Sequence, residues 1–267
     1  DLVDSGAICI AYETVTDGRG GLPLLAPMSQ VAGRMSIQAG AHCLERAQGG
    51  AGVLLAGVPG VRPAKVVIVG GGVVGENAAY MAVGMGADVT ILDRNVDTMR
   101  SLVVRFGQSV KTLYSTSLTL EEEMLAADLV IGAVLLPGAE APKLITRDLV
   151  SRMKKGSVIC DVAIDQGGCA ETSMATTHAE PTYVVDDVVH YCVANMPGAV
   201  SHTSTYALNN VTLPFTLALA DKGYKQALLD DQHLLNGLNV CQGKVSYEAV
   251  ADDLGYDYIE AKAALGI

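Results

Sequence analysis

The sequence of 267 residues has no tryptophan, two phenylalanines and no long hydrophobic run. Half of its residues are hydrophobic, yet Gly, Asp or Pro interrupts every apolar stretch before the roughly 18 residues that a membrane helix needs. Basic residues are scarce too, since 18 Lys and Arg oppose 29 Asp and Glu and leave a formal charge of −11. Nucleic acid and anionic membrane surfaces would repel such a chain. We therefore expect neither as a partner.

Metal-ligand and redox patterns are also absent from the sequence. The six cysteines form no C-x-x-C pair, and most of them lie in apolar surroundings. The chain has no H-E-x-x-H, no Cys/His cluster and no G-x-S-x-G, so neither a metal site nor a serine triad is supported. No signal peptide is evident. These features predict a cytoplasmic protein with reduced thiols and no bound metal.

The most informative motif is a G-x-G-x-x-G sequence that follows a run of β-branched residues at 65–69. Gly70 permits a tight turn, Gly72 lets the backbone approach a pyrophosphate closely, and Gly75 lets the following helix pack on the strand. The N-terminus of that helix offers free N–H groups and a partial positive charge to phosphates. The motif predicts nucleotide binding, with a Gly-rich turn in another α/β protein as the alternative.

An acidic residue completes this pattern. Asp93 stands eighteen residues after Gly75, at the end of a second apolar strand, 87–92. Its carboxylate would accept hydrogen bonds from the adenosine ribose and would repel a 2′-phosphate, which favours NAD over NADP. Arg94 follows directly and weakens that preference.

From residue 65 onward, strands and helices alternate regularly. The pattern predicts an α/β fold with a Rossmann-type, doubly wound parallel sheet and right-handed crossovers. We expect a further strand near 182–185 to close the sheet, and a short strand at 53–55 within the Gly- and Pro-rich loop 49–63. The other expected elements are strands at 65–69, 87–92, 110–114, 128–133 and 157–162, and helices at 73–84, 95–106, 118–126 and 146–154.

The segments on either side are expected to be remnants of a second α/β domain that binds substrate. A buried-type strand at 7–12 lies near the start, and a long helix at 27–48 links it to the nucleotide domain. Beyond Pro197 the pattern becomes helical, at 202–221 and 223–236, with no obvious sheet of its own. The predicted domains are the end of the substrate domain (1–24), the NAD-binding domain with its linking helix (25–201) and the helical return to the substrate domain (202–267).

Ligands of open α/β sheets bind at the carboxyl ends of the strands. Asp165 follows the strand 157–162 in a Gly-rich loop, where substrate and nicotinamide would meet, although it could equally cap a turn. Asp161, at the same strand end, could differ from it in solvation and hence in pKa. The small residues of 131–138 could admit the nicotinamide ribose, and 114–115 could lie near the adenine. Plain turns and strand ends explain both segments as well.

Histidine is a common acid or base in hydride-transfer enzymes because its pKa lies near neutrality. His42 and His233 are expected at the surface, given their places on a helix and in the C-terminal tail. His178 and His190 flank the Asp165 region, and for each of them a structural role is the favoured interpretation.

Several long motifs make the chain similar to the NAD-dependent L-alanine dehydrogenases. The similarity covers essentially the whole chain, and the motifs occur in the order of the family. The NAD-binding subunit of proton-translocating transhydrogenase shares the fold, but the run 165–169 fits the alanine dehydrogenases better. The motifs are PMSQVAG at 27–33, VAIDQGGC at 162–169, DDVVHY at 186–191, ANMPGAV at 194–200 and TYALNN at 205–210.

The resemblance implies reversible oxidative deamination of L-alanine to pyruvate and ammonia with NAD, in a homo-oligomer that is a hexamer in this family. Asp165 would be the catalytic carboxylate, acting at the water or ammonia step. The implied cofactor-binding residues are Ser29 at the pyrophosphate, Gly70, Gly72, Val74 and Gly75 in the glycine turn, Asp93 at the ribose, Ser115 near the adenine, Val134 and Leu135 on the nicotinamide side, and Val162, Ala163, Ile164, Asp165, Val193, Ala194, Asn195 and Met196 at the domain junction.

One departure from the family pattern concerns the substrate site. The family's Arg and Lys that hold the substrate carboxylate, and its acid/base His, lie in the N-terminal part of the full protein. Arg34, Lys65 and the five histidines match none of them, so we expect this chain alone to bind NAD but to be inactive or severely impaired. The alternatives are the transhydrogenase subunit and a non-catalytic NAD-binding module.

Overall fold

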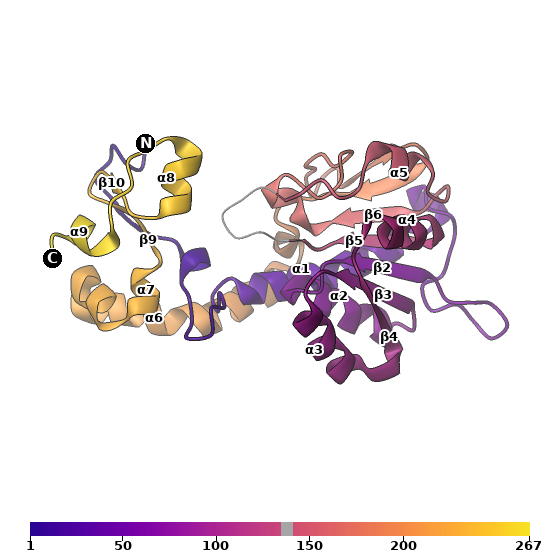
Figure 1. Ribbon diagram of the computed structural model, residues 1–267, viewed down its shortest axis with the longest axis horizontal. Coiled ribbons are helices and arrows are strands. Elements are labelled where there is room, and N and C mark those ends of the chain that lie inside the picture. Colours follow the sequence, from indigo (N-terminus) through magenta and orange to yellow (C-terminus); the bar gives the residue numbers. More distant parts are fainter. Residues whose placement is uncertain (135–140) are drawn as a thin grey trace. The chain divides into compact units, whose positions relative to one another are not determined.

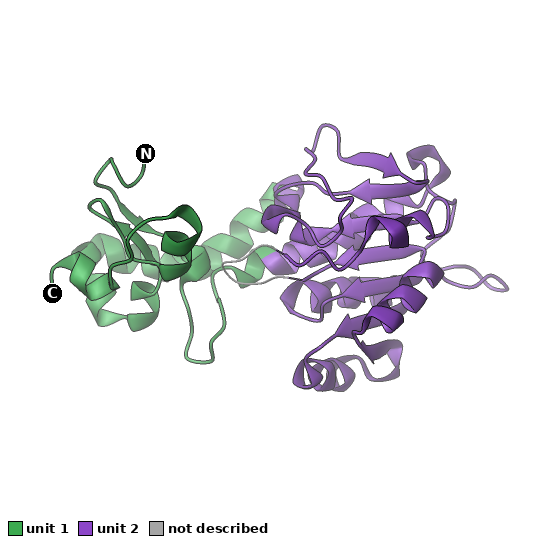
Figure 2. Ribbon diagram, turned by 45° about the horizontal axis from the view of Figure 1, so that its top comes forward, with its two compact units in different colours: residues 1–28, 201–267 green, residues 29–200 purple. Residues whose placement is uncertain are grey.

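The computed structural model describes residues 1–134 and 141–267. The chain divides into two compact units, residues 1–28 with 201–267 and residues 29–200 (Figure 2). The first unit is therefore built from two segments that are far apart in the sequence, and the second from one continuous segment. Each unit has a hydrophobic core of its own.

The larger unit, residues 29–200, is built on a sheet of seven strands in the order β4-β3-β2-β5-β6-β8-β7 (Figure 1). All neighbours pair in parallel except β7, which is antiparallel to β8 at the sheet edge. The predicted Rossmann-type fold is thus confirmed. The strands are β2 (Lys65–Val69), β3 (Asp88–Asp93), β4 (Val110–Tyr114), β5 (Leu129–Gly132), β6 (Val158–Asp161), β7 (Thr182–Val185) and β8 (Val188–Tyr191).

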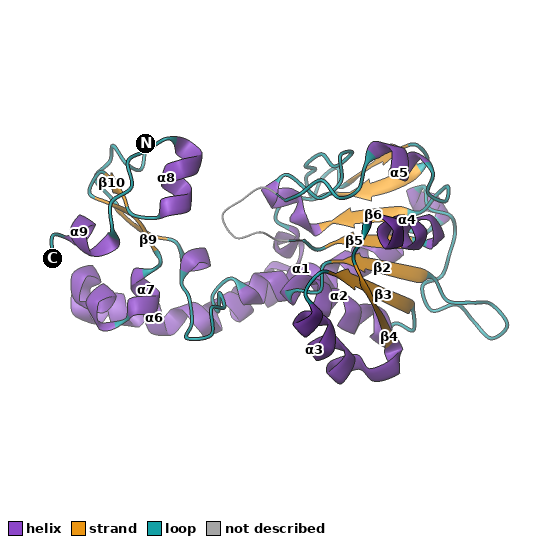
Figure 3. Cartoon of the chain, in the orientation of Figure 1, coloured by secondary structure: helices purple, strands orange, loops and turns teal. Residues whose placement is uncertain are grey.

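Helices cover both faces of this sheet (Figure 3). Side chains alternate between the faces of a strand, so Val66 and Ile68 enter one core cluster with α1, α2 and α3, while Val67 and Val69 enter another with α4 and α5. The helices are α1 (Ala26–Cys43), α2 (Val73–Gly84), α3 (Val96–Phe106), α4 (Ser117–Ala126) and α5 (Arg147–Ser151), with short 3₁₀ turns at Arg46–Gln48, Gly107–Ser109, Val162–Gln166 and Met196–Val200.

The strand order creates a topological switch point between β2 and β5. From β2 the chain winds outward through β3 to β4, and then returns to place β5 on the other side of β2. At such a point the connections on the two sides lead away from each other, which leaves room for a ligand at the carboxyl ends of the strands. The G-x-G-x-x-G turn follows β2 at this position.

The smaller unit contains a three-stranded antiparallel sheet in the order β1-β9-β10. The prediction that the C-terminal tail has no sheet is therefore wrong. All three strands are very short, and a two-residue turn joins the two C-terminal ones; its residues Gln242 and Gly243 both have positive φ, 49° and 83°. The elements are β1 (Ile8–Ile10), a 3₁₀ turn (Tyr12–Thr14), α6 (Ser201–Asp230), α7 (Gln232–Leu235), β9 (Leu238–Cys241), β10 (Lys244–Val245), α8 (Glu248–Leu254) and α9 (Ala261–Leu265).

Several predicted boundaries differ from the structure. The strand expected at 7–12 is limited to Ile8–Ile10 and is only half-buried, because β9 is its one partner strand. The helix expected at 27–48 ends at Cys43, since Glu45 is extended (φ −68°, ψ 146°) and a 3₁₀ turn follows. No strand forms at 53–55, where glycines with positive φ at 52 and 57 bracket the segment.

The C-terminal helices break near the predicted place. Gly223, with φ 73° and ψ 158°, interrupts α6 between the two expected helices. The second of these ends at Asp230 instead of residue 236, because the Asp231 side chain accepts the N–H groups of His233 and Leu234 and starts α7. The strand expected at 182–185 is present, but β8, which joins it to the sheet, was not predicted.

Candidate nucleotide and catalytic site

The turn after β2 depends on two glycines. Gly70 has φ 102°, and a Cβ there would lie 2.6 Å from the carbonyl oxygen of Ala133. A Cβ at Gly75 would overlap with the carbonyl oxygen of Gly70. These close approaches hold the first turn of α2 against the end of β2. Val74, in the same turn, is buried.

Gly72 has a different environment. It is the N-cap of α2, with φ −68°, and within the described parts of the chain no heavy atom lies within 4 Å of the position of a Cβ. Internal packing therefore does not require a glycine here. Among the described residues nothing fills the position beside this N-cap, and the first N–H groups of α2 are suited to receive an anionic group. This arrangement fits the pyrophosphate of a dinucleotide.

Asp93 lies beside the glycine turn. Its carboxylate accepts the N–H groups of Gly71, at 2.6 Å, and Asn95, at 2.7 Å. The N–H of Ser115 donates to the backbone carbonyl of Asp93 at 2.9 Å, so the ends of β3 and β4 lie together. Three residues predicted from separate parts of the sequence, Gly72, Asp93 and Ser115, thus occupy neighbouring strand ends.

Ser29 and Val134 reach the same region from two other elements. A Cβ at Gly33 of α1 would overlap with the carbonyl oxygen of Val74, so α1 crosses α2 in close contact. Ser29 precedes Gly33 by one helical turn and shares its face of α1. On the other side, the N–H of Val134 lies near Gly70, 3.2 Å from the position of a Cβ there. Leu135, also predicted, is outside the described residues.

Asp165 lies in the 3₁₀ turn after β6 and is exposed. Its Oδ1 accepts the N–H of Asn195 at 3.3 Å. The two segments predicted at the domain junction, 162–165 and 193–196, are thereby joined at the ends of the adjacent strands β6 and β8. Asn195 has a left-handed backbone with φ 57°, and its carbonyl lies 3.1 Å from His178 Nε2.

The junction residues differ in what they can offer a ligand. Four of them are buried, namely Ala163, Ile164, Val193 and Met196. Val162 is partly exposed, and Ala194, Asn195 and Asp165 are exposed. A ligand at this edge would therefore contact the side chains of the exposed residues. It would contact the buried residues only through their backbone atoms.

Asp161 and Asp165 differ in solvation, as considered from the sequence. Asp161 is fully buried, and its carboxylate is surrounded by donors from the following loop. Asp165 extends toward solvent. Sequence reasoning placed Asp161 at the strand end but missed this internal hydrogen-bonding role, because the donors come from up to twelve residues away.

Lys143 is a second residue that sequence reasoning missed. Its ammonium group donates to the carbonyl oxygens of Gly167, Gly168 and Ala170. No motif marks this lysine, because its role arises from the path of the segment 141–145 beside the loop after β6.

His190 has the structural role favoured from the sequence. It is fully buried on β8, its Nδ1–H donates to the Val188 carbonyl at 3.0 Å, and its Nε2 lies 2.8 Å from the Thr172 hydroxyl. Burial lowers the pKa of this imidazole below its ordinary value, because the charged form would lose its hydration. A neutral ring bonded on both sides satisfies the core without a proton-transfer role.

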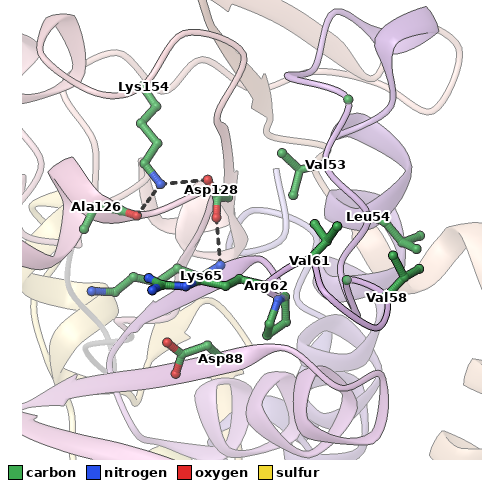
Figure 4. A pocket seen from close by; sticks show the side chains of 13 residues that line it. Val53, Leu54, Val58, Val61, Arg62, Lys65, Asp88, Ala126, Asp128 and Lys154 are labelled. Carbon is green, nitrogen blue, oxygen red and sulfur yellow. Dashed lines mark hydrogen bonds and ion pairs between the residues drawn. The ribbon is translucent and has the colours of Figure 1, made fainter.

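A cavity of about 600 Å³ opens at the opposite, amino-terminal edge of the sheet (Figure 4). Most of its charged wall residues are in ion pairs, Lys154 with Asp128 at 2.8 Å and Lys65 with Glu123 at 2.7 Å, whereas Arg62 is exposed. The cavity therefore has most of its wall charge compensated within the protein. It is also separated by the length of the strands from the glycine turn and Asp165.

Other kinds of site find no counterpart in the described residues. Residues 1–134 and 141–267 contain no group of three or more His, Cys, Asp or Glu side chains that could hold a metal ion. In those same ranges, no helix combines the length and apolar character needed to cross a membrane. All six cysteines are free thiols, and five of them are buried.

Comparisons with known proteins agree with this geometry. A family model described as "Alanine dehydrogenase/PNT, C-terminal domain" matches residues 36–248. The alanine dehydrogenase of Halomonas elongata is 66% identical over 99% of this chain and 71% of that protein, and the Bacillus subtilis alanine dehydrogenase is 59% identical over 99% and 70%.

Solved structures give the same result. An L-alanine dehydrogenase has a TM-score of 0.90 and 55% identity, over 95% of this chain and 70% of that one. A transhydrogenase from Sinorhizobium meliloti shares the fold with a TM-score of 0.72 and 24% identity, over 93% and 68%. With a family model over most of its length and relatives of this identity over nearly all of it, the chain belongs to the alanine dehydrogenase family.

Proposed function

We propose that this protein catalyses the reversible, NAD-dependent oxidative deamination of L-alanine to pyruvate and ammonia. One observation carries the proposal: the glycine turn, Asp93 and Asp165 lie at the same edge of one parallel sheet, in a chain that matches alanine dehydrogenases along nearly its whole length. The first two features suit a dinucleotide, and the third supplies an exposed carboxylate at that edge.

The binding roles follow from the geometry of the strand ends. The open N-terminus of α2 at Gly72 would receive the pyrophosphate, with Val74 in the same turn and Ser29 contributed by α1. The carboxylate of Asp93 would accept a ribose hydroxyl, and Ser115 would lie near the adenine. A 2′-phosphate would meet the negative charge of Asp93, which supports NAD over NADP.

The reactive end of the cofactor would lie near β5, β6 and β8. Val134 and Leu135 would border the nicotinamide, and the segments 162–165 and 193–196 would complete the cofactor site where it meets the substrate. Bound NAD supplies the hydride acceptor, while the protein supplies position and proton transfer. Exposure of Asp165 lets its carboxylate exchange protons with the solvent and with the water or ammonia that adds and leaves.

We further propose that the protein works in the cytoplasm as a homo-oligomer, with the hexamer of the family as the expected form. Free thiols support a reducing compartment. The domain assignment of the sequence, with substrate-domain segments at 1–24 and 202–267 around an NAD-binding domain at 25–201, is part of the same proposal.

The test is a comparison of the full-length protein with its Asp165→Asn variant. We expect L-alanine to drive NADH formation, and the variant to lower kcat by about a hundredfold or more, because a positioned acid or base contributes at least that much. NADH binding, followed by fluorescence, should persist in the variant. The transhydrogenase alternative predicts instead hydride exchange between NAD and NADP analogues without alanine, and a binding module predicts NADH binding with no turnover.

A further inference from the structure

The loop after β6 closes around a buried carboxylate. Asp161 has none of its surface exposed. Its Oδ2 accepts the N–H groups of Cys169 at 2.8 Å and Ala170 at 3.2 Å and the hydroxyl of Ser173 at 2.5 Å, while its Oδ1 accepts the N–H of Ala163 at 3.1 Å. A buried charge is stable only with such compensation. The carboxylate therefore ties the beginning and the end of the loop 162–170 together.

A positive charge holds the same loop through its carbonyl groups. Lys143 donates to Gly167, to Gly168 at 2.9 Å and to Ala170 at 3.4 Å. The segment that carries Lys143 is fixed beside the loop, because Ala141 N–H donates to the Gln166 carbonyl and Ile145 N–H to that of Cys169. The N–H groups of the loop thus bind the Asp161 carboxylate, while its C=O groups bind the Lys143 ammonium group.

The loop needs this support because of its own sequence. Gly167 and Gly168 are consecutive and both have positive φ, 86° and 79°, a pair that would sample many conformations if unrestrained. A Cβ at Gly168 would lie 2.8 Å from Asp161 Oδ2, so glycine is what allows the loop to close on the carboxylate. The two glycines would make the loop flexible, and the side chains of Asp161 and Lys143 restrain it.

We propose that Asp161 and Lys143 are positioning residues for Asp165. Together they fix the loop 162–170, and the fixed loop holds the Asp165 carboxylate at the Asn195 N–H, at the carboxyl ends of β6 and β8. This inference rests on the proposed catalytic role of Asp165. A displacement of about 1 Å in a reacting group can lower a rate about a hundredfold, which is why such support matters for catalysis.

Asp161→Asn is the sharpest change, because it alters one atom without changing the volume. An asparagine oxygen can keep the three donors at Oδ2, but its amide group then faces the N–H of Ala163, two donors against each other. Ser173→Ala removes one donor and leaves the charge, which provides a milder variant should the first fail to fold. Lys143→Met removes the cation, and Lys143→Arg retains it.

The readouts are steady-state kinetics of alanine oxidation by the full-length protein, NADH affinity, and hydrogen exchange of the loop amides. We expect Asp161→Asn and Lys143→Met to lower kcat about ten- to a hundredfold, and to lower NADH affinity by a smaller factor, because most of the proposed cofactor contacts lie outside this loop. Lys143→Arg should retain most of the activity. The amides of Ala163, Cys169 and Ala170 should exchange faster in Asp161→Asn. Lys111→Met, the same substitution at an exposed lysine on β4, is the matched control and should change none of these.

A double-mutant cycle separates positioning from simple destabilisation. In an Asp165→Asn background, Asp161→Asn should cause no further loss of kcat, because the group that it positions is already absent. An undiminished second loss, or a normal kcat in Asp161→Asn despite faster exchange, would overturn the proposal. If the wild-type protein binds NADH but does not oxidise alanine, the proposed function itself fails, and the exchange data then show whether the loop is held without a catalytic consequence.

Discussion

At the scale of single residues, two charged side chains at the end of β3 bear on the proposed cofactor preference. Asp93 places a carboxylate beside the N–H of Gly71, where it would meet the ribose of a dinucleotide. Arg94, the next residue, is exposed and carries the opposite charge. On the proposed assignment, the preference between NAD and NADP would depend on these two adjacent side chains.

We predict that Asp93→Asn raises NADPH affinity by about tenfold or more, because the like-charge contact between the carboxylate and the 2′-phosphate disappears. NADH affinity should fall, since the ribose loses its charged acceptor. Fluorescence titration with both reduced nucleotides measures the ratio. Adding Arg94→Ala to Asp93→Asn should remove much of the gain, because the arginine would then be the counter-charge of the 2′-phosphate. Unchanged selectivity in Asp93→Asn would contradict the assignment of this residue.

At the scale of elements, two glycines of the turn after β2 have different roles, which substitutions can distinguish. A Cβ at Gly75 overlaps with the Gly70 carbonyl, whereas at Gly72 it meets open space in the described structure. We predict that Gly75→Ala lowers the free energy of unfolding by about 1–3 kcal/mol, the range found for overpacking. Gly72→Ala should fold with wild-type stability but bind NADH poorly.

Urea unfolding and NADH titration of the two variants provide the comparison, and each serves as the control of the other. Equal stability of both would mean that α2 does not need its close approach to β2. Tight NADH binding by Gly72→Ala would place the pyrophosphate elsewhere.

Elements with strong local signals were predictable, and those that depend on partners were not. The run Lys65–Val69 with its glycines is recognisable because a strand buried on both faces is almost continuously apolar. β8 escaped prediction since Asp186 and Asp187, both with positive φ, form its turn without the usual glycine. β9 and β10 are too short to show periodicity.

The same limit applies to the site. The motif residues were identified from the sequence, but the contact between Asp165 and Asn195 depends on β6 lying beside β8, and that pairing required a strand that was not predicted. The resemblance to the family supplied both segments, whereas only the three-dimensional structure joins them. Asp161 and Lys143 had no signal of their role in the sequence, because their partners are backbone atoms of a folded loop.

For the molecule as a whole, buried thiols make the free energy of unfolding decrease at alkaline pH. Burial raises the pKa of Cys43 to about 11 from an ordinary value of 9.0, and it also raises the pKa values of Cys160, Cys169 and Cys192. A raised pKa means that folding favours the protonated thiol. Its contribution to stability is therefore complete below pH 9.0 and is lost as the pH rises from there through about 11.

We predict a free energy of unfolding that falls steadily above about pH 9. Urea titrations across this range measure it. Cys43→Ala should make the fall shallower, although the variant is less stable at neutral pH because it leaves a small cavity. An identical alkaline slope in that variant would show that this thiol does not titrate on unfolding.

Because the smaller unit is built from two distant segments, it constrains the order in which the chain can fold during synthesis. Ile8 pairs with Cys241, so the whole of the larger unit lies between these two partners in the sequence. Residues 29–200 form a continuous unit with its own core and can fold while the ribosome is still making the tail. The pairing of β1 with β9 can form only after residues 238–241 have been synthesised. An insertion that folds early shortens the distance this strand must search, because it replaces a long flexible loop by a compact body.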